Sequence, residues 1–314
     1  MPELPEVEHT RRTLEPHLVG RTVVAARLLR RDIAVAPGDP PGGFSRSRTR
    51  RHDAPRRLTR ADLLAGERIA RLDRRGKQLA IVADSGRALL VHLGMTGHLA
   101  WRPPGDRAPA PPHVHATWTL ADARGRDAGR LIFRDPRRFG GLWILRSPED
   151  LAARWAALGP DALTITPHDL AARLAATRRP IKAALLDQST IAGVGNIYAD
   201  ESLFLARIHP ATPADRLTAD QVAALAAAIR QVLHESLDAG GSTLRDYLDA
   251  TGRAGAYQDA HRVYGRAGLP CPACGTTLLA LRLGQRTTVA CPSCQPEPRL
   301  PRAGGRGRRV ITRR

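Results

Sequence analysis

The chain has 314 residues, with 49 Lys or Arg against 30 Asp or Glu, and a formal net charge of +19 at pH 7. This surplus favours a polyanionic partner, most simply nucleic acid. The sequence contains no apolar run of about 18 residues and no basic-then-apolar signal region, so we expect no membrane contact and a cytoplasmic protein that associates with the nucleoid.

The N-terminus carries the most distinctive motif of the chain, Met1-Pro2-Glu3-Leu4-Pro5-Glu6-Val7-Glu8. If Met1 is removed, Pro2 becomes a terminal secondary amine that can condense with an aldehyde to give a charged iminium ion. Glu3 could then pass protons to and from the group that Pro2 attacks, which is the pairing that covalent catalysis requires. Proline and glutamate are also common in the first turn of a helix, so the motif could serve only to begin one.

The first 146 residues predict one helix followed by many short strands. The helix is expected within residues 1–20, and strands are expected at 22–29, 67–72, 79–82 and 88–91. Residues 30–60 interrupt this pattern with prolines, glycines and arginines, and we interpret them as a basic insertion that either touches DNA phosphate or remains solvated. We expect residues 1–146 to form a two-layer β-sandwich domain.

The pattern changes near residue 147 to alanine-rich helical segments, which predict a second domain over residues 147–262. Helices are expected at 150–158, 169–177, 181–188 and 196–207, and another begins after Thr218. The stretch 187–201 joins two of these helices through Gly193 and Gly195. Glycines there permit close backbone approach, and the free N–H groups of the next helix suit a phosphate.

The four cysteines form two CxxC pairs, Cys271 with Cys274 and Cys291 with Cys294, separated by 16 residues. This spacing predicts one structural Zn²⁺ in a four-cysteine zinc ribbon over residues 263–295, which would hold a β-hairpin that has too little core to fold alone. Two disulfides are the alternative. The last residues, 296–314, contain seven arginines without apolar periodicity and predict a disordered basic tail with salt-sensitive DNA affinity.

Lysine is rare in this chain, because only Lys77 and Lys182 are lysines among the 49 basic residues. A lysine ammonium can shift its pKa and donate a proton, which a guanidinium cannot readily do. The two lysines are therefore candidates for positions that require an ammonium group, although two lysines can also remain by chance.

The N-terminal motif, the stretch 187–201 and the cysteine pairs together resemble the formamidopyrimidine-DNA glycosylase family of bifunctional base-excision repair enzymes. The resemblance covers nearly the whole chain except residues 30–60 and the tail. It implies an α+β multidomain fold: an N-terminal two-layer β-sandwich with an N-terminal helix, a helical domain with a helix–two-turn–helix motif, and a C-terminal zinc-ribbon hairpin. It also implies a monomer that binds damaged double-stranded DNA.

The family's chemistry implies excision of oxidised purines, such as 8-oxoguanine and formamidopyrimidines, through a Schiff base on Pro2, followed by β,δ-elimination at the abasic site. Glu3 would be the proton donor and acceptor, and Lys77 the catalytic lysine. Gln78 departs from the tyrosine that usually follows this lysine, which puts the packing beside it in question. Arg286, at the expected tip of the ribbon hairpin, matches an arginine linked to phosphate contact and the final elimination.

The resemblance also implies a set of DNA contacts. Met95 would fill the space of the extruded nucleotide, Arg137 would bond the orphaned base, and Phe139 would wedge between base pairs, which offsets part of the few kcal/mol that unstacking costs. The implied phosphate contacts are Asn196, His113 and Arg178, with Lys182 as a further candidate. A glycine-rich loop at 251–258 would cover the flipped base.

Two alternatives remain open. An endonuclease VIII-type enzyme shares the chemistry but prefers oxidised pyrimidines, and both the Leu4-Pro5-Glu6 version of the N-terminus and the stretch 240–258 argue against it. A non-catalytic zinc-ribbon DNA-binding protein would use the N-terminal motif only to begin a helix. Retention of Met1 would favour that second alternative, because a blocked Pro2 cannot form an iminium ion.

Overall fold

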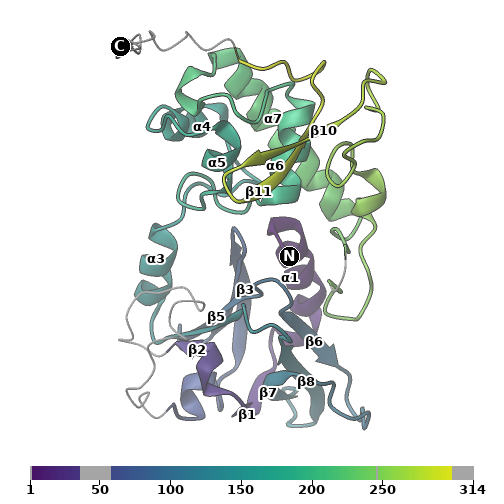
Figure 1. Ribbon diagram of the computed structural model, residues 1–314. Helices are drawn as coiled ribbons and strands as arrows, with labels where there is room; N and C mark the ends of the chain where they lie inside the picture. The colour runs from purple at the N-terminus through teal and green to yellow at the C-terminus, as the bar shows by residue number, and fades with distance from the viewer. Residues whose placement is uncertain (1, 36–57, 245–246, 299–314) are drawn as a thin grey trace, which may run out of the picture.

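The computed structural model describes residues 2–35, 58–244 and 247–298 (Figure 1). Most of the predicted insertion at 30–60, and all of the predicted tail beyond its first three residues, lie outside the described residues. Over these three ranges, none of the helices has both the length and the apolar character needed to cross a membrane.

The lower half of Figure 1 is built from two β-sheets, with α1 (Leu4–Leu18) above them. The four-stranded sheet has the order β1 (Thr22–Leu28), β7 (Val114–Ala121), β8 (Asp127–Arg134), β6 (His98–Arg102). The five-stranded sheet has the order β2 (Ala34–Val35), β9 (Gly141–Leu145), β5 (Ala88–His92), β4 (Gln78–Ala83), β3 (Ile69–Arg75). Neighbouring strands run antiparallel except β2 and β9, which run parallel. Two short 3₁₀ turns, Arg31–Ile33 and Ala61–Leu63, flank the undescribed stretch.

The two sheets enclose one hydrophobic core. Trp118 and Phe133 of the four-stranded sheet meet Leu79 of the five-stranded sheet, and Leu14 of α1 joins the same cluster. Trp118 is 2% exposed, and its indole N–H donates to the Leu63 carbonyl at 3.0 Å, so its polar atom is satisfied. The predicted two-layer β-sandwich with an N-terminal helix is confirmed.

The upper half is helical and contains α4 (Pro167–Leu174), α5 (Ile181–Leu186), α6 (Asn196–Leu205) and α7 (Ala219–Asp238), with 3₁₀ turns at Ala214–Arg216 and Tyr257–Ala260. Thr166 and Thr218 cap α4 and α7 by accepting backbone N–H bonds, as such residues do at helix starts. Another helix, α3 (Pro148–Ala156), packs instead on the outer face of the five-stranded sheet through Leu151.

The last described unit is a hairpin of β10 (Leu279–Leu283) and β11 (Arg286–Ala290), which packs against α6. Arg286, which we expected at the hairpin tip, is the first residue of β11, directly after the turn between the two strands. The mixed α+β fold class is thereby confirmed along the described chain, with helix α1 lying between the sandwich and the helical half.

Candidate active site and zinc site

The N-terminal residues lie buried where the two halves meet. Pro2 is buried, and Glu3 is 1% exposed. One Glu3 carboxylate oxygen accepts the backbone N–H of Ile197, in the first turn of α6, at 3.1 Å. The other oxygen is buried and has no hydrogen-bond partner within the described ranges. A buried carboxylate with one satisfied and one free oxygen is suited to exchange a proton with a group that binds beside it.

The glycine turn before α6 is shaped around this carboxylate. A Cβ at Gly195 would lie 2.2–2.5 Å from the Glu3 carboxyl atoms, and a Cβ at Gly193 would lie 2.3 Å from the Leu4 side chain. Gly193 has a φ of +116°, and its carbonyl accepts the Leu4 N–H at 3.2 Å. Glycine is therefore required at both positions, because the turn packs directly on the start of the chain.

Glu6, which the sequence analysis did not identify as a site residue, is the second buried carboxylate here. It accepts three hydrogen bonds: from the Tyr198 hydroxyl at 2.5 Å, from the Ser242 N–H at 2.8 Å and from the Glu3 N–H at 2.7 Å. Burial, together with the charge of Glu3, raises the pKa of Glu6 despite these bonds. Glu6 belongs to the N-terminal motif, but two of its partners, Tyr198 and Ser242, lie 192 and 236 residues away in the chain.

Lys77 occupies the turn between β3 and β4. Burial lowers its pKa, the charge of Arg286 lowers it further, and the charges of Glu3 and Glu6 offset part of the effect. Lys77 therefore lies close enough to Glu3, Glu6 and Arg286 for their charges to act on its pKa. Arg286 is exposed at the start of β11 and is thus free to meet a ligand.

The Lys77 turn is held from both halves of the molecule. Arg74 makes two bonds to Asp161, at 2.7 and 3.0 Å, and one to Glu8 at 2.9 Å. Asp161 also accepts the Gly76 N–H at 2.8 Å. Burial alone would raise the pKa of Glu8, but hydrogen bonds from its arginine neighbours and the charge of Arg74 lower it to about 2. The lysine therefore sits on a turn fixed by paired charges.

Met95, Arg137 and Phe139 are presented by two adjacent loops, 93–97 and 135–141. Met95 is 40% exposed and Phe139 is 37% exposed, and the Arg137 side chain beside them is exposed too. The Arg137 guanidinium carbon lies 4.8 Å from the Phe139 ring centre. These three side chains are thus available to an incoming partner.

The two loops are fixed to each other by polar contacts. The Thr96 hydroxyl donates to Asp135 at 2.5 Å and accepts the Arg137 N–H at 3.1 Å. The Gly94 N–H donates to His92 Nδ1 at 3.1 Å, and burial, together with the charge of Lys77, lowers the pKa of His92 to about 4, so this ring is neutral near pH 7. The loops are therefore tied together as one unit.

The other three residues predicted to contact DNA, His113, Asn196 and Arg178, lie in different parts of the structure. His113 is exposed with a φ of +65°, and its carbonyl accepts the Asp135 N–H at 3.1 Å, beside the two loops. Asn196 begins α6 and donates to the Thr287 carbonyl at 3.3 Å. Arg178 projects into solvent, with 94% of its side chain exposed and Asp215 at 3.6 Å.

Lys182 does not suit the phosphate contact that the sequence suggested. It is 1% exposed, and its ammonium lies 2.7 Å from Asp200 and 2.8 Å from the Thr288 hydroxyl. A buried ion pair of this kind is already compensated, so Lys182 joins α5, α6 and β11 instead of facing solvent.

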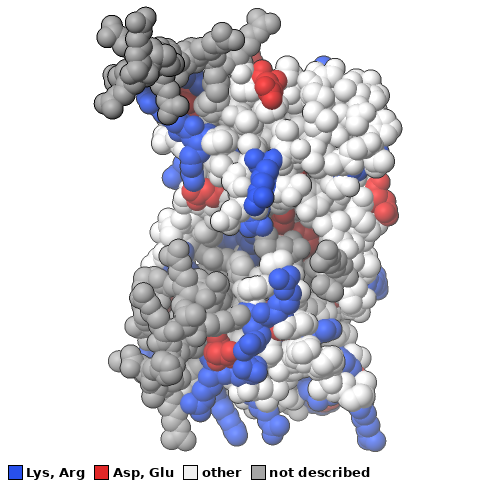
Figure 2. All heavy atoms as spheres, in the orientation of Figure 1, with Lys and Arg blue, Asp and Glu red and all other residues white. Residues whose placement is uncertain are grey.

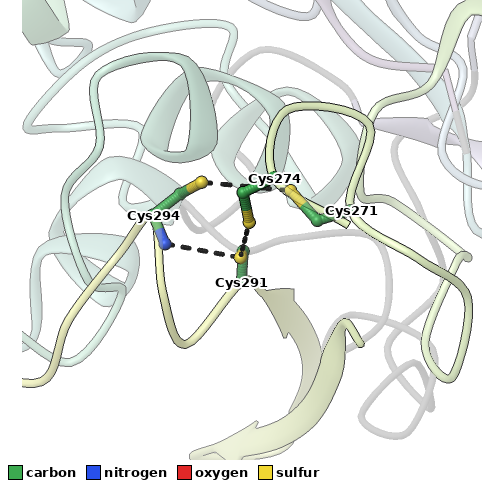
Figure 3. Close-up of side chains that lie close together, drawn as sticks. All are labelled: Cys271, Cys274, Cys291 and Cys294. Carbon is green, nitrogen blue, oxygen red and sulfur yellow. Dashed lines mark hydrogen bonds between the residues drawn. The ribbon is translucent and has the colours of Figure 1, made fainter. Parts of the chain in front are cut away.

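The four cysteine thiols converge at the base of the hairpin, as Figure 3 shows. All four Sγ atoms lie within 4.8 Å of one another, with 3.9 Å between Cys271 and Cys294 and 3.5 Å between Cys274 and Cys291. A tetrahedral Zn²⁺ with Zn–S bonds of about 2.3 Å needs sulfurs about 3.8 Å apart. The cysteines are free thiols, so the disulfide alternative is wrong and the set fits one structural Zn²⁺.

Basic side chains gather on the face seen in Figure 2, along the middle of the molecule and across the level where the two halves meet. Acidic side chains are few on this face. A surface of this kind attracts a polyanion by sequence-independent electrostatics.

The sandwich, the helices and the zinc ribbon define a zinc-binding α+β protein of three parts. Family models match all three: the formamidopyrimidine-DNA glycosylase N-terminal domain over residues 1–142, the formamidopyrimidine-DNA glycosylase H2TH domain over 157–247, and the zinc finger found in FPG and IleRS over 268–296. The chain belongs to the formamidopyrimidine-DNA glycosylase family.

Individual relatives agree. The formamidopyrimidine-DNA glycosylase of Chloroflexus aggregans is 46% identical over 297 residues, which cover 94% of this chain and 98% of the relative. The crystal structure of the MutM (Fpg) protein from Thermus thermophilus is 40% identical with a TM-score of 0.76, covering 95% of this chain and 100% of that one. A Lactococcus lactis Fpg mutant in complex with Fapy-dG containing DNA is 30% identical with a TM-score of 0.78, and the match covers 94% of this chain and 100% of that one.

Replacing Gly195 by Ala should destabilise the fold by about 1–3 kcal/mol, because the added methyl group collides with the buried Glu3 carboxylate. In a Glu3→Ala background the same change should cost much less, since the colliding atoms are gone. Urea unfolding of the two single variants and the double variant measures this coupling. Additive costs would contradict the packing described here.

Zinc analysis by atomic absorption should give one ion per chain. Cys274→Ala leaves three thiolates, so it should remove most of the bound zinc and expose the β10–β11 amides to hydrogen exchange. Ser293→Ala, which changes a residue between Cys291 and Cys294 that is not a ligand, is the control and should retain one zinc ion per chain. A full equivalent of zinc in the Cys274→Ala protein would rule out the four-cysteine site.

Proposed function

We propose that the protein is a base-excision repair enzyme that removes oxidised purines from duplex DNA and cleaves the abasic site left behind. Family membership supports the glycosylase activity, and the relative whose structure contains Fapy-dG supports the purine lesion. The observation that carries the proposal is the buried Glu3 beside Pro2, with one carboxylate oxygen unpaired among the described residues. Action as a monomer in the cytoplasm, on nucleoid DNA, is part of the same proposal.

Base release begins with Pro2. Once Met1 is removed, the Pro2 nitrogen attacks C1′ of the damaged nucleotide, and the electron pair of the C1′–base bond leaves with the base, which takes up a proton. Glu3 takes up the proton that the Pro2 nitrogen loses and gives a proton to the ring oxygen O4′ as the sugar opens, which leaves an iminium ion between Pro2 and C1′. The free carboxylate oxygen of Glu3 is suited to this transfer.

Strand cleavage follows by two eliminations. Loss of a proton from C2′ expels the 3′ phosphate, and loss of a further proton from C4′ expels the 5′ phosphate, with the iminium ion as the electron sink. Lys77 acts as the acid or stabilising cation in this sequence, and Arg286 contacts the flanking phosphates. The lowered pKa of Lys77 makes its ammonium group a stronger acid than an ordinary lysine.

The remaining residues bind and open the duplex. Met95, Arg137 and Phe139 occupy the space of the extruded purine, and Asn196 contacts the phosphate beside it. His113 and Arg178 add phosphate contacts. In this division, residues 1–146 carry the chemistry, 147–262 bind DNA, and the ribbon at 263–295 supplies Arg286.

A duplex with one 8-oxoguanine opposite cytosine should lose the base and be cut at the site by the Met1-processed, zinc-loaded protein. A Glu3→Gln variant should slow base release by about 100-fold or more, because it cannot donate the proton. Gel analysis of the strand ends under single-turnover conditions measures both steps.

An oxidised-pyrimidine duplex run in parallel distinguishes the alternatives. Cleavage of that duplex alone would assign the endonuclease VIII-type activity. Binding without cleavage of either duplex would indicate a DNA-binding protein that lacks the activity.

The pH dependence of strand cleavage should report Lys77. Since burial lowers its pKa, Lys77 loses its proton as the pH rises through a value below the usual lysine pKa of about 10.4, and the rate should fall there. Lys77→Arg keeps its charge at higher pH, so the falling limb should move upward. An identical falling limb in both proteins would exclude Lys77 as the titrating cation.

A further inference from the structure

Residues 247–253, which we call the strap, leave the helical half and dock on the edge of the sandwich. The strand they meet, β6, is an edge strand of the four-stranded sheet. The Asp249 carbonyl accepts a bond from His98 Nε2 at 2.9 Å, and the Ala250 carbonyl accepts the Trp101 N–H at 2.9 Å. Ala250 is 1% exposed and belongs to the sandwich core. The strap therefore packs as a part of the sandwich.

One buried carboxylate organises the strap. Asp249 is 3% exposed, and its Oδ1 accepts the Thr251 N–H at 2.8 Å, the Thr251 hydroxyl at 2.8 Å and the Arg253 N–H at 2.9 Å. Its Oδ2 lies 3.4 Å from Nε2 of His9, on α1. The same side chain thus closes the turn and attaches it to the N-terminal helix.

The strap touches both parts of the proposed machinery. At its start, the Tyr247 hydroxyl donates to the Glu6 carbonyl at 3.1 Å, beside the reacting end of the chain. Where it docks, it holds His98, the residue that directly follows the loop 93–97 bearing Met95. The strap thereby links the two by direct hydrogen bonds, and its last residues, 251–253, begin the glycine-rich loop expected to cover the flipped base.

We propose that Asp249 is a positioning residue for base release, with His9 and His98 as its anchors. Through the strap, Asp249 holds the loop that bears Met95 at a fixed position relative to the N-terminal residues Pro2 to Glu6. A nucleotide that Met95 displaces is then placed within reach of the Pro2 nitrogen. This inference rests on the proposed function. Both substrates must bring C1′ to Pro2, but a preformed abasic site has no base to unstack, so its cleavage depends much less on this register.

The test compares two single-turnover rates in full-length, zinc-loaded protein: base release from the 8-oxoguanine duplex and cleavage of a preformed abasic-site duplex. Asp249→Ala should slow base release by about 10- to 100-fold, the range expected for a misplaced reacting group, and change abasic-site cleavage by less than about threefold. Asp249→Asn should largely restore base release, because its amide oxygen can accept the same three bonds.

Asp122→Ala is the matched control, since Asp122 closes a comparable turn between β7 and β8 by accepting the Arg124 and Arg126 N–H groups, both at 2.9 Å. It should leave both rates unchanged.

Equal slowing of both reactions by Asp249→Ala, or no slowing of base release, would overturn the inference. If Asp249→Ala does not fold, His98→Ala must give the same split between the rates. Absence of both reactions in the unmodified protein would refute the proposed function instead.

Discussion

Two carboxylates, Glu3 and Glu6, are buried together at the start of the chain, and the rest of the structure depends on satisfying them. Burying a charged group without partners costs several kcal/mol, so each carboxylate must find donors. Those donors are the Ile197 N–H, the Tyr198 hydroxyl and the Ser242 N–H, all from the helical half. The N-terminus is consequently held at the junction of the two halves, where Pro2 and Glu3 are buried.

The same constraint explains the neighbouring architecture. The glycine turn before α6 is compact because a side chain at Gly195 would collide with Glu3. The Arg74 and Asp161 pair fixes the Lys77 turn against the helical half. The N-terminus and the Lys77 turn are thus brought to one junction by contacts that no single half could supply.

The sequence predicted the features that have a local signature. The two CxxC pairs predicted the zinc site, strand alternation predicted the sandwich, and the N-terminal motif indicated the family. It did not predict the role of Glu6 or the contacts of Asp249 with His9 and His98, because these partners lie far away in the chain and pairings of that kind leave no periodic pattern. The prediction that Lys182 contacts phosphate was wrong for a related reason. The sequence shows that lysine is rare, but the burial of Lys182 against Asp200 depends on how α5, α6 and β11 pack.

The central claim is that the chain acts through its own N-terminal nitrogen. The most direct measurement is borohydride reduction of the protein on an abasic-site duplex, followed by digestion and mass spectrometry of the cross-linked peptide. We expect a single adduct on the nitrogen of Pro2 in a chain that has lost Met1. An adduct on the ammonium nitrogen of Lys77, or on a chain that retains Met1, would contradict it.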